Sequence, residues 1–294
     1  MLRNSWSEPD AWLRCVHPLP LTVDPRAYAK IRHDAQALAS RAFADHEGII
    51  CSPHLAPYSL VNRRRVSRAS AAGPIYKTIG ATTLKAHIFM PAGPIKAIQR
   101  AAIVLLHGGG WSTGSPEWMS DDAKRYSGLG MVAIAGEHRL SDQKSVTALD
   151  AMADVRELIR WVRTNAADLS VDPHRIAAYG VSAGGHFAVS AAVFPHTEEG
   201  GISAVPDTLV LVSSPVSLLN DKWPQLLLGA HAEAKSVSPA ENVTQRLPPI
   251  VIIEGAADTV TPPPAARRFC DRTKQLGGSC ELHIYAVAFI WASG

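Results

Sequence analysis

The sequence predicts an α/β fold, a three-layer sandwich in which a mostly parallel central sheet lies between helices. Two apolar runs, residues 101–106 and 131–135, suit strands that are buried on both faces of such a sheet. From about residue 74 onward, strand patterns alternate with helical ones, as in folds built from right-handed crossovers. The chain has 294 residues, enough for one large domain of this class or for two small ones.

Residues 1–70 differ from the rest and are expected to form a small N-terminal helical cap beside a main domain over residues 71–294. Within the cap, residues 24–47 have the apolar spacing of an amphipathic helix. A basic run at residues 62–65 is interpreted as a solvated surface segment, because no aromatic residues interleave it as they do in nucleic-acid sites.

The main domain opens with an expected antiparallel pair of strands, residues 75–79 and 84–90. A long helix is predicted over residues 146–169, where apolar residues recur at steps of three and four. Residues 216–247 are irregular, with one or two short helices. The other predicted strands are 101–106, 131–135, 175–179, 208–212, 249–253 and 280–285, and the other helices are 117–129, the segment after residue 182, and 263–276.

Composition favours an ordinary soluble globular protein, with 47% hydrophobic and 19% charged residues. The net charge of +3 is too small to argue for a nucleic acid or an anionic membrane surface as partner. No apolar run approaches the roughly 20 residues of a membrane helix. The N-terminal segment has no apolar core of a signal peptide, so we expect a cytoplasmic protein.

The four cysteines, Cys15, Cys51, Cys270 and Cys280, show neither metal-ligand nor C-x-x-C spacing. We therefore expect reduced, structural thiols and no metal or other cofactor. A bridge between Cys270 and Cys280 is the alternative.

The segment Gly180-Val181-Ser182-Ala183-Gly184 carries the strongest chemical signal. It reads G-x-S-x-G between a predicted strand and a predicted helix, which is the setting of a nucleophile elbow. Glycines on both sides of Ser182 allow other backbone to approach the corner, where a Cβ would clash. The pattern predicts a serine whose hydroxyl is exposed above the sheet.

A glycine-rich segment, His107-Gly108-Gly109-Gly110-Trp111, follows the predicted strand 101–106. Successive glycines there can present backbone N–H groups to a developing oxyanion, together with the amide of Ala183. A plain glycine turn and a phosphate loop are the alternatives. A phosphate loop would require a lysine after its last glycine, and none follows here.

The third signal is Asp258, which ends the segment EGAAD after the predicted strand 249–253. Alone, it would be interpreted as a solvated loop aspartate. A serine corner, a glycine loop and an acid, in this order and all at the carboxyl ends of predicted strands, together indicate one site for acyl transfer.

With these segments the chain resembles the α/β-hydrolases of the HGGG esterase group. This group includes hormone-sensitive-lipase-like carboxylesterases and bacterial acetyl-xylan and feruloyl-type esterases. The matching segments span roughly residues 75–285, and Gly114 and Asp154 also fit the pattern. They read HGGGW (107–111), EHRLSD (137–142), DPHRIAAYGVSAGGH (172–186) and PPIVIIEGAAD (248–258).

The resemblance implies a carboxylic ester hydrolase that acts on small acyl or aryl esters through an acyl-enzyme. It makes Ser182 the nucleophile, Asp258 the acid of the triad, and Gly109, Gly110 and Ala183 the oxyanion donors. His107 would be structural, holding the loop by hydrogen bonds, with Gly108, Gly180 and Gly184 as supporting residues of the motifs. The expected partner is a small-molecule ester, with no nucleic acid or membrane, and a homodimer is an open option.

The C-terminal segment departs from the family pattern. Counting from Tyr285, Ile290 stands where the family has its catalytic histidine, and the final helix of the fold is expected to be missing. A truncated or frame-shifted gene copy is one hypothesis for this ending. His138 stands where the family has a tyrosine, and we assign it no role.

The other histidines do not fill the gap in the expected triad. His283 lies inside the predicted strand 280–285, and His186 lies one helical turn beyond the nucleophile, away from the acid. His174, His196 and His231 have no supporting pattern. The sequence therefore predicts a triad without its histidine.

Two classes of function remain open at this stage. The first is an esterase, whose turnover would disappear when Ser182 is replaced by alanine. The alternative is a catalytically impaired hydrolase fold that binds a small ligand without turnover. A peptidase is less favoured, because no propeller-like domain precedes the main domain, while hydrolysis of small formamides stays open.

Overall fold

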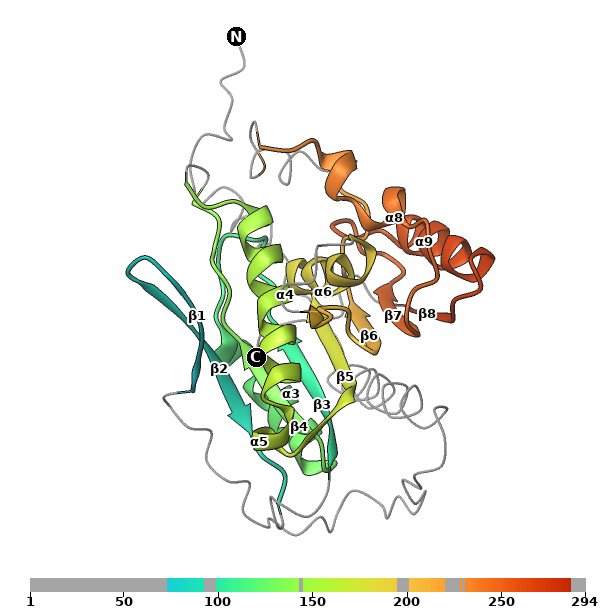
Figure 1. Ribbon diagram of the computed structural model, residues 1–294. Helices are drawn as coiled ribbons and strands as arrows, with labels where there is room; N and C mark the ends of the chain where they lie inside the picture. The colour runs from blue at the N-terminus through green and yellow to red at the C-terminus, as the bar shows by residue number, and fades with distance from the viewer. Residues whose placement is uncertain are drawn as a thin grey trace.

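An eight-stranded sheet forms the centre of the described chain, in the order β1-β2-β4-β3-β5-β6-β7-β8 (Figure 1). β1 pairs with β2 and β2 with β4 in antiparallel fashion, and every other neighbouring pair is parallel. The predicted mostly parallel sheet is confirmed. The strands are β1 (Ile75–Ile79), β2 (Thr82–Phe89), β3 (Arg100–Leu106), β4 (Val132–Gly136), β5 (Val171–Val181), β6 (Thr208–Val212), β7 (Ile250–Gly255) and β8 (Cys280–Tyr285).

The computed structural model describes residues 73–92, 99–142, 145–194, 201–219, 228 and 231–286. The expected cap over residues 1–70, with its helix and its two cysteines, lies outside these ranges, as do His196 and Ile290. None of the described helices combines the length and the apolar character that crossing a bilayer requires.

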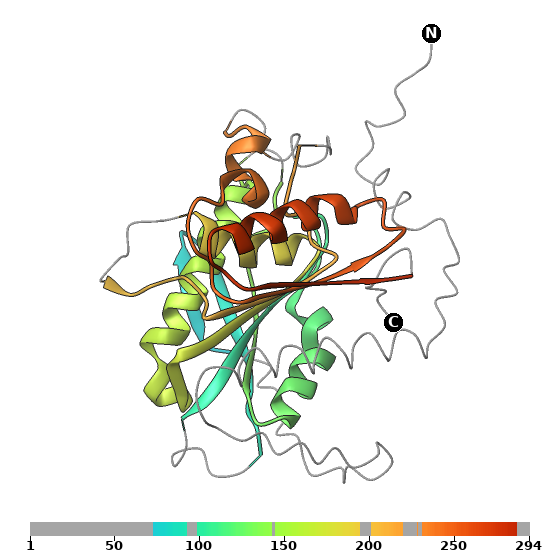
Figure 2. The same ribbon diagram turned by 90° about the vertical axis from the view of Figure 1, so that its right-hand side faces the viewer.

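Helices cover both faces of the sheet, which gives the predicted three layers. On one face lie α4 (Ala148–Thr164), α6 (Ala183–Val193) and α9 (Pro263–Gln275), and on the other lies α3 (Ser120–Gly128), as Figure 2 shows for α9 and α3. Side chains alternate along each strand, so the apolar strand β3 supplies both cores. Its Val104 packs in the core of α4 and α6, and its Ile103 packs in the core of α3.

The helix predicted over residues 146–169 is in fact two helices, α4 and the short α5 (Ala166–Leu169). The break has a local cause, because the side-chain amide of Asn165 donates to the carbonyl oxygen of Trp161 (2.8 Å) and ends α4. Ser170 then takes a left-handed conformation (φ 54°) that directs the chain into β5, which begins earlier than expected. The irregular stretch after β6 contains two short helices, η3 (Ala234–Val237) and α8 (Pro239–Asn242), as predicted.

A disulfide joins Cys270 in α9 to Cys280 at the start of β8. The expectation of reduced thiols is wrong for this pair. The turn between the two elements, with Gly277 at φ 78°, brings the two Cα atoms to 5.4 Å, within the range that a disulfide spans. The bridge fastens the edge strand β8 to the helix that covers it.

Candidate active site

Ser182 occupies a sharp corner between β5 and α6, at φ 51° and ψ −122°. Such a backbone conformation costs about 1–3 kcal/mol in a residue with a Cβ, so the surroundings must hold it. The Ser182 amide donates to the carbonyl oxygen of Val212 in β6 (3.0 Å), and its own carbonyl accepts from the amide of Gly185 (2.9 Å). The side chain is partly exposed. The predicted elbow therefore has the expected backbone shape.

The two glycines that flank Ser182 are needed because other backbone passes against them. A Cβ on Gly180 would lie 2.4 Å from the carbonyl carbon of Gly184, inside the elbow itself. A Cβ on Gly184 would lie 2.2 Å from the carbonyl oxygen of Leu106, at the end of β3. Both distances are far below van der Waals contact. The sequence thus permits an approach of β3 and α6 that no other residue type allows.

The glycine loop after β3 lies directly against the nucleophile. A Cβ on Gly108 would stand 3.1 Å from the Cβ of Ser182. The carbonyl of Gly109 is held by Thr113, which donates to it from its amide (3.0 Å) and from its hydroxyl (3.0 Å). Neither the Gly109 amide nor the Ala183 amide donates to another group in the described part of the chain. Both can therefore act as donors to a ligand at the corner.

The stacked imidazole rings of His107 and His138 lie next to this glycine loop. The rings of His107 and His138 lie 4.3 Å apart between centroids at an angle of 22°. His107 Nδ1 bonds to the carbonyl of Gly108 (2.7 Å), as the structural role implied by the resemblance requires. Burial lowers the pKa of His107, and burial together with the neighbouring His107 lowers that of His138 to about 3. Both rings are therefore neutral at pH 7, and His138 packs beneath the loop.

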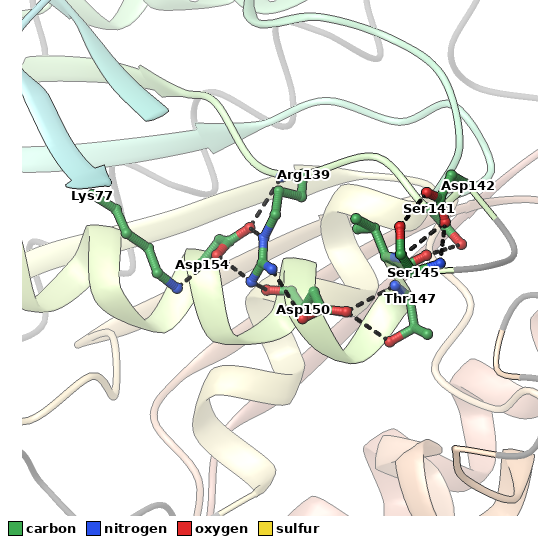
Figure 3. Close-up of polar contacts among 9 residues, drawn as sticks. Lys77, Arg139, Ser141, Asp142, Ser145, Thr147, Asp150 and Asp154 are labelled. Atoms are coloured by element: carbon green, nitrogen blue, oxygen red, sulfur yellow. Dashed lines mark hydrogen bonds and ion pairs between the residues drawn. The ribbon is translucent and has the colours of Figure 1, made fainter. Parts of the chain in front are cut away.

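A buried ion cluster fixes the segment that carries His138 (Figure 3). Asp154 in α4 accepts from the Lys77 ammonium of β1 (2.7 Å) and from the Arg139 guanidinium (2.9 Å). Although burial alone would raise it, the hydrogen bonds from Arg139 and Lys77 lower the pKa of Asp154. Arg139 follows His138 directly, and the Ser141 amide donates to the carbonyl of Trp111 (2.8 Å). The ion cluster thus holds the segment after β4 against the glycine loop.

His186 has a structural role that the sequence did not reveal. Its Nδ1 accepts from the indole N–H of Trp111 (3.3 Å), so its Nε2 carries the proton and donates to the carbonyl of Val237 (2.9 Å). Burial lowers the pKa of His186 to about 4. With both nitrogens occupied, the ring cannot serve as base for Ser182. That His186 lies away from the acid stays a prediction, and the structure shows that the ring bonds to Trp111 and Val237 instead.

Asp258 lies in the loop after β7, where the sequence placed it, and is 4% exposed. Its Oδ1 accepts from the amides of Val260 and Thr261 (2.8 Å each), and its Oδ2 accepts from the Thr261 hydroxyl (2.9 Å). Three donors thus occupy both oxygens of the Asp258 carboxyl group. Glu254, expected in the same loop, is instead part of β7 and fully buried.

No side chain of a described histidine forms a hydrogen bond with the side chain of Ser182 or Asp258. His283 lies on β8 and faces Glu281 on the same strand (3.3 Å), as expected for a strand residue. His174 and His231 are exposed. Over the same residues, no group of three or more His, Cys, Asp or Glu side chains is arranged to hold a metal ion. The described site therefore combines a serine corner, a glycine loop and a buried acid, without an imidazole between them.

Comparison with known proteins finds esterases that are similar to this chain. The BD-FAE family model matches residues 87–203. Thermogutta terrifontis esterase 2, solved as the form phosphonylated by sarin, is 33% identical over 78% of this chain and 88% of its own, with a TM-score of 0.71. The propionate-bound form of this esterase is 35% identical over 74% of this chain and 83% of its own, with a TM-score of 0.68.

Curated relatives match over a shorter length. Carboxylesterase NlhH of Mycobacterium tuberculosis is 32% identical over 108 residues, which are 36% of this chain and 33% of NlhH. The chain thus spans about a third of the length of that relative.

The strand order, with a serine corner after β5 and a glycine loop after β3, defines an α/β-hydrolase. The chain belongs to the α/β-hydrolase carboxylesterase family, as the BD-FAE match and the likeness to esterase 2 indicate.

Proposed function

We propose that this chain is a carboxylic ester hydrolase for small acyl or aryl esters and that it works through an acyl-enzyme on Ser182. The observation that carries the proposal is the strained corner at φ 51°, with the backbone of the glycine loop packed against the Ser182 Cβ. Ser182 is partly exposed at this corner, so its hydroxyl can meet a ligand. The arrangement suits a nucleophile beside preorganised donors.

In the proposed reaction, Ser182 Oγ forms a bond to the ester carbonyl carbon and the carbonyl electron pair moves onto oxygen. The amides of Gly109 and Ala183 would donate hydrogen bonds to that oxyanion, with Gly110 as the predicted third donor. The intermediate collapses, the bond to the alcohol breaks, and water then releases the acid from the serine. Because the proposed triad lacks its histidine, the Ser182 hydroxyl proton would pass through water to the departing alcohol, and the water that cleaves the acyl-enzyme would return a proton to Ser182 Oγ. Asp258 is the acid that would orient a base at this place.

A short acyl group is favoured as the substrate of this chain. Esterase 2, which shares the fold and about a third of the residues, has been solved with propionate bound and with butyrate bound. We propose that the corner at Ser182 takes acyl groups of that size.

We further propose that the triad is incomplete, with Ile290 in the place of the histidine. The motif spacing after Tyr285 supports this, and so do the contacts of Asp258, whose described partners are Val260 and Thr261. Loss of one triad member typically leaves catalysis on the order of 10³–10⁴-fold over water, which comes from the oxyanion hole and from binding. We therefore expect slow turnover that still depends on Ser182.

The test compares hydrolysis of p-nitrophenyl acetate and butyrate, and labelling by a fluorophosphonate, in three proteins. We expect the wild type to label and to hydrolyse slowly, and Ser182→Ala to do neither. Ser190→Ala is the matched control, because Ser190 is a buried serine in α6 whose hydroxyl has no hydrogen-bond partner among the described residues. Equal rates in wild type and Ser182→Ala would show that the chain is not a serine esterase. Wild-type rates far above 10⁴-fold over water would instead show that the triad has its base.

The alternative, a hydrolase fold that binds a small ligand without turnover, is favoured by one observation. Among the described residues, no imidazole reaches the acid at Asp258. This function predicts saturable binding of butyrate in calorimetry, together with no difference in ester hydrolysis between wild type and Ser182→Ala.

A further inference from the structure

A chain of buried hydrogen bonds connects the serine corner to the loop after β7 that carries Asp258, which we call the acid loop. It starts at the carbonyl oxygen of Val212, which accepts both the Ser182 amide (3.0 Å) and the Ser214 hydroxyl (3.1 Å). The Ser214 amide donates to Oε1 of Glu254 (3.2 Å). Oε2 of Glu254 then lies 3.3 Å from the Thr261 hydroxyl, which also contacts Asp258. Glu254 is thus the central link between nucleophile and acid.

The Thr261 hydroxyl lies between two carboxyl oxygens and has one proton to donate. It lies 2.9 Å from Oδ2 of Asp258 and 3.3 Å from Oε2 of Glu254. If both acids were ionised, one of the two oxygens would face a hydroxyl lone pair instead of a hydrogen. Both contacts are hydrogen bonds only if one of the acids carries a proton.

The surroundings decide which acid carries that proton. Asp258 accepts two backbone amides at Oδ1 and the Thr261 hydroxyl at Oδ2, so both of its oxygens already face donors. Glu254 is fully buried and accepts a single backbone amide. Its neighbours on the flanking strands are neutral: Ser214 follows β6, and Ile284 lies opposite it on β8. The charge that acts on Glu254 is that of Asp258, and burial together with this charge raises the pKa of Glu254 well above its ordinary value.

We propose that Glu254 is a positioning residue, a neutral carboxylic acid that donates to Thr261 and thereby directs the Thr261 hydroxyl proton to Asp258. Through Ser214 it also holds this acid loop in register with the backbone that supports Ser182. The role in catalysis rests on the esterase function proposed above. The protonation state of Glu254 does not, and it can be measured separately.

Infrared spectroscopy tests the protonation state without any activity. At neutral pH we expect a carboxylic-acid C=O band in the wild type that is absent from Glu254→Gln. Glu281→Gln, at an exposed carboxylate on β8, is the matched control and should keep the band. A wild-type spectrum without such a band, or a band that persists in Glu254→Gln, would overturn the proposal.

Kinetics test the positioning role. Glutamine reproduces the neutral acid, since its carbonyl can accept from Ser214 and its NH₂ can donate to Thr261. We expect Glu254→Gln to keep kcat for p-nitrophenyl butyrate within about 3-fold. Glu254→Leu removes the acceptor of the Ser214 amide and so disturbs the backbone that supports the Ser182 nucleophile. It should lose on the order of 10- to 100-fold in kcat with little change in KM, because a misplaced catalytic group costs rate more than binding.

The threonine provides a second pair of variants that does not alter Glu254. Thr261→Val should reproduce the loss in kcat seen for Glu254→Leu, and Thr261→Ser, which keeps the hydroxyl, should restore most of the rate. Equal kcat in the valine and serine variants, or in the leucine and glutamine variants of Glu254, contradicts the positioning role. If the wild type neither labels nor hydrolyses, the proposed esterase function fails, and the infrared band alone decides the state of Glu254.

Discussion

The nucleophile half and the acid half of the site are built in different ways. The nucleophile half, the glycine loop after β3 and the corner after β5, is shaped by backbone that approaches glycines at distances where no Cβ fits. The acid half, the end of β7 and the loop to Thr261, is shaped by side chains that share hydrogen bonds around Glu254 and Asp258. The nucleophile half depends on close backbone packing at glycines, and the acid half depends on which carboxyl group carries a proton. We therefore expect added side-chain atoms to disrupt the first half and changes in pH or hydrogen bonding to disrupt the second.

The supports of the two halves differ as well. The glycine loop is held by neutral stacked imidazoles and, through Arg139, by the buried carboxylate of Asp154. β7 and β8 of the acid half are backed by α9, which is fastened by the Cys270–Cys280 disulfide. A noncovalent ion cluster supports one half and a covalent link the other.

The largest expected effect is the loss of the ion cluster. Asp154→Ala leaves the partly buried cations Lys77 and Arg139 without their carboxylate, and we expect a loss of about 3–5 kcal/mol in the free energy of unfolding. Asp121→Ala is the control, because Asp121 pairs with Lys124 on the surface, where the change should stay below about 0.5 kcal/mol. Urea unfolding measures both. Equal losses in the two variants would show that the cluster does not support the nucleophile half.

The next effect tests whether backbone contact determines the nucleophile half. Gly184→Ala places a Cβ 2.2 Å from the carbonyl of Leu106, and we expect a loss of about 3 kcal/mol with loss of labelling at Ser182. Gly128→Ala, also at a helical glycine, has nothing within 4 Å of the new Cβ and should gain up to about 1 kcal/mol. Urea unfolding and fluorophosphonate labelling separate the outcomes. A folded, labelled Gly184→Ala protein would contradict the close approach.

Reduction of the disulfide should weaken the acid half. The bridge closes a loop with a sequence separation of 10, which corresponds to about 2–3 kcal/mol of stability in the chain-entropy account. Urea midpoints with and without dithiothreitol measure the effect in the wild type. The double variant Cys270→Ala/Cys280→Ala is the control and should be insensitive to the reductant. A wild-type midpoint that does not change would mean that the bridge adds no stability.

These contrasts explain what the sequence could and could not predict. The serine corner and the glycine loop were predictable, because steric rules require glycine and serine within a few adjacent positions. The hydrogen bond between Trp111 and His186 spans 75 positions, and the ion pair of Lys77 with Asp154 spans 77. No local sequence pattern encodes pairs of residues this far apart in the chain. Asp154 fitted the family pattern, but the sequence did not indicate what it does.

The acid half was less predictable, for a physical reason. Asp258 was found from its place after a late strand, but Glu254 was expected in a loop and is a buried strand residue. Its environment arises from Ser214 and Thr261, which come from two other segments. A protonation state depends on such surroundings and not on residue order. The same holds for the disulfide, which needed the turn between α9 and β8 to become evident.

The smallest effect per side chain comes from pH, and the two halves should depend on pH with opposite sign. The nucleophile half buries neutral imidazoles, since burial lowers the pKa of His138 to about 3 and of His186 to about 4. The unfolded chain binds protons near pH 6.5, so stability falls as the pH drops below that value, by roughly 2 kcal/mol per histidine at pH 5. The acid half buries Glu254, whose pKa is raised, so its contribution falls as the pH rises above about 4.5.

Unfolding in urea at pH 5 and pH 8 separates these two contributions. His138→Phe keeps a buried ring without a titrating nitrogen, so it should lose less stability than the wild type between pH 8 and pH 5. His174→Gln, at an exposed position, should behave as the wild type. Glu254→Gln should be more stable than the wild type at pH 8 and should lose that advantage at pH 5. Relative to the wild type, the stability of His138→Phe should rise as the pH falls, and that of Glu254→Gln should rise as the pH increases. If both variants change in the same direction, either His138 is not neutral or Glu254 is not protonated in the folded protein.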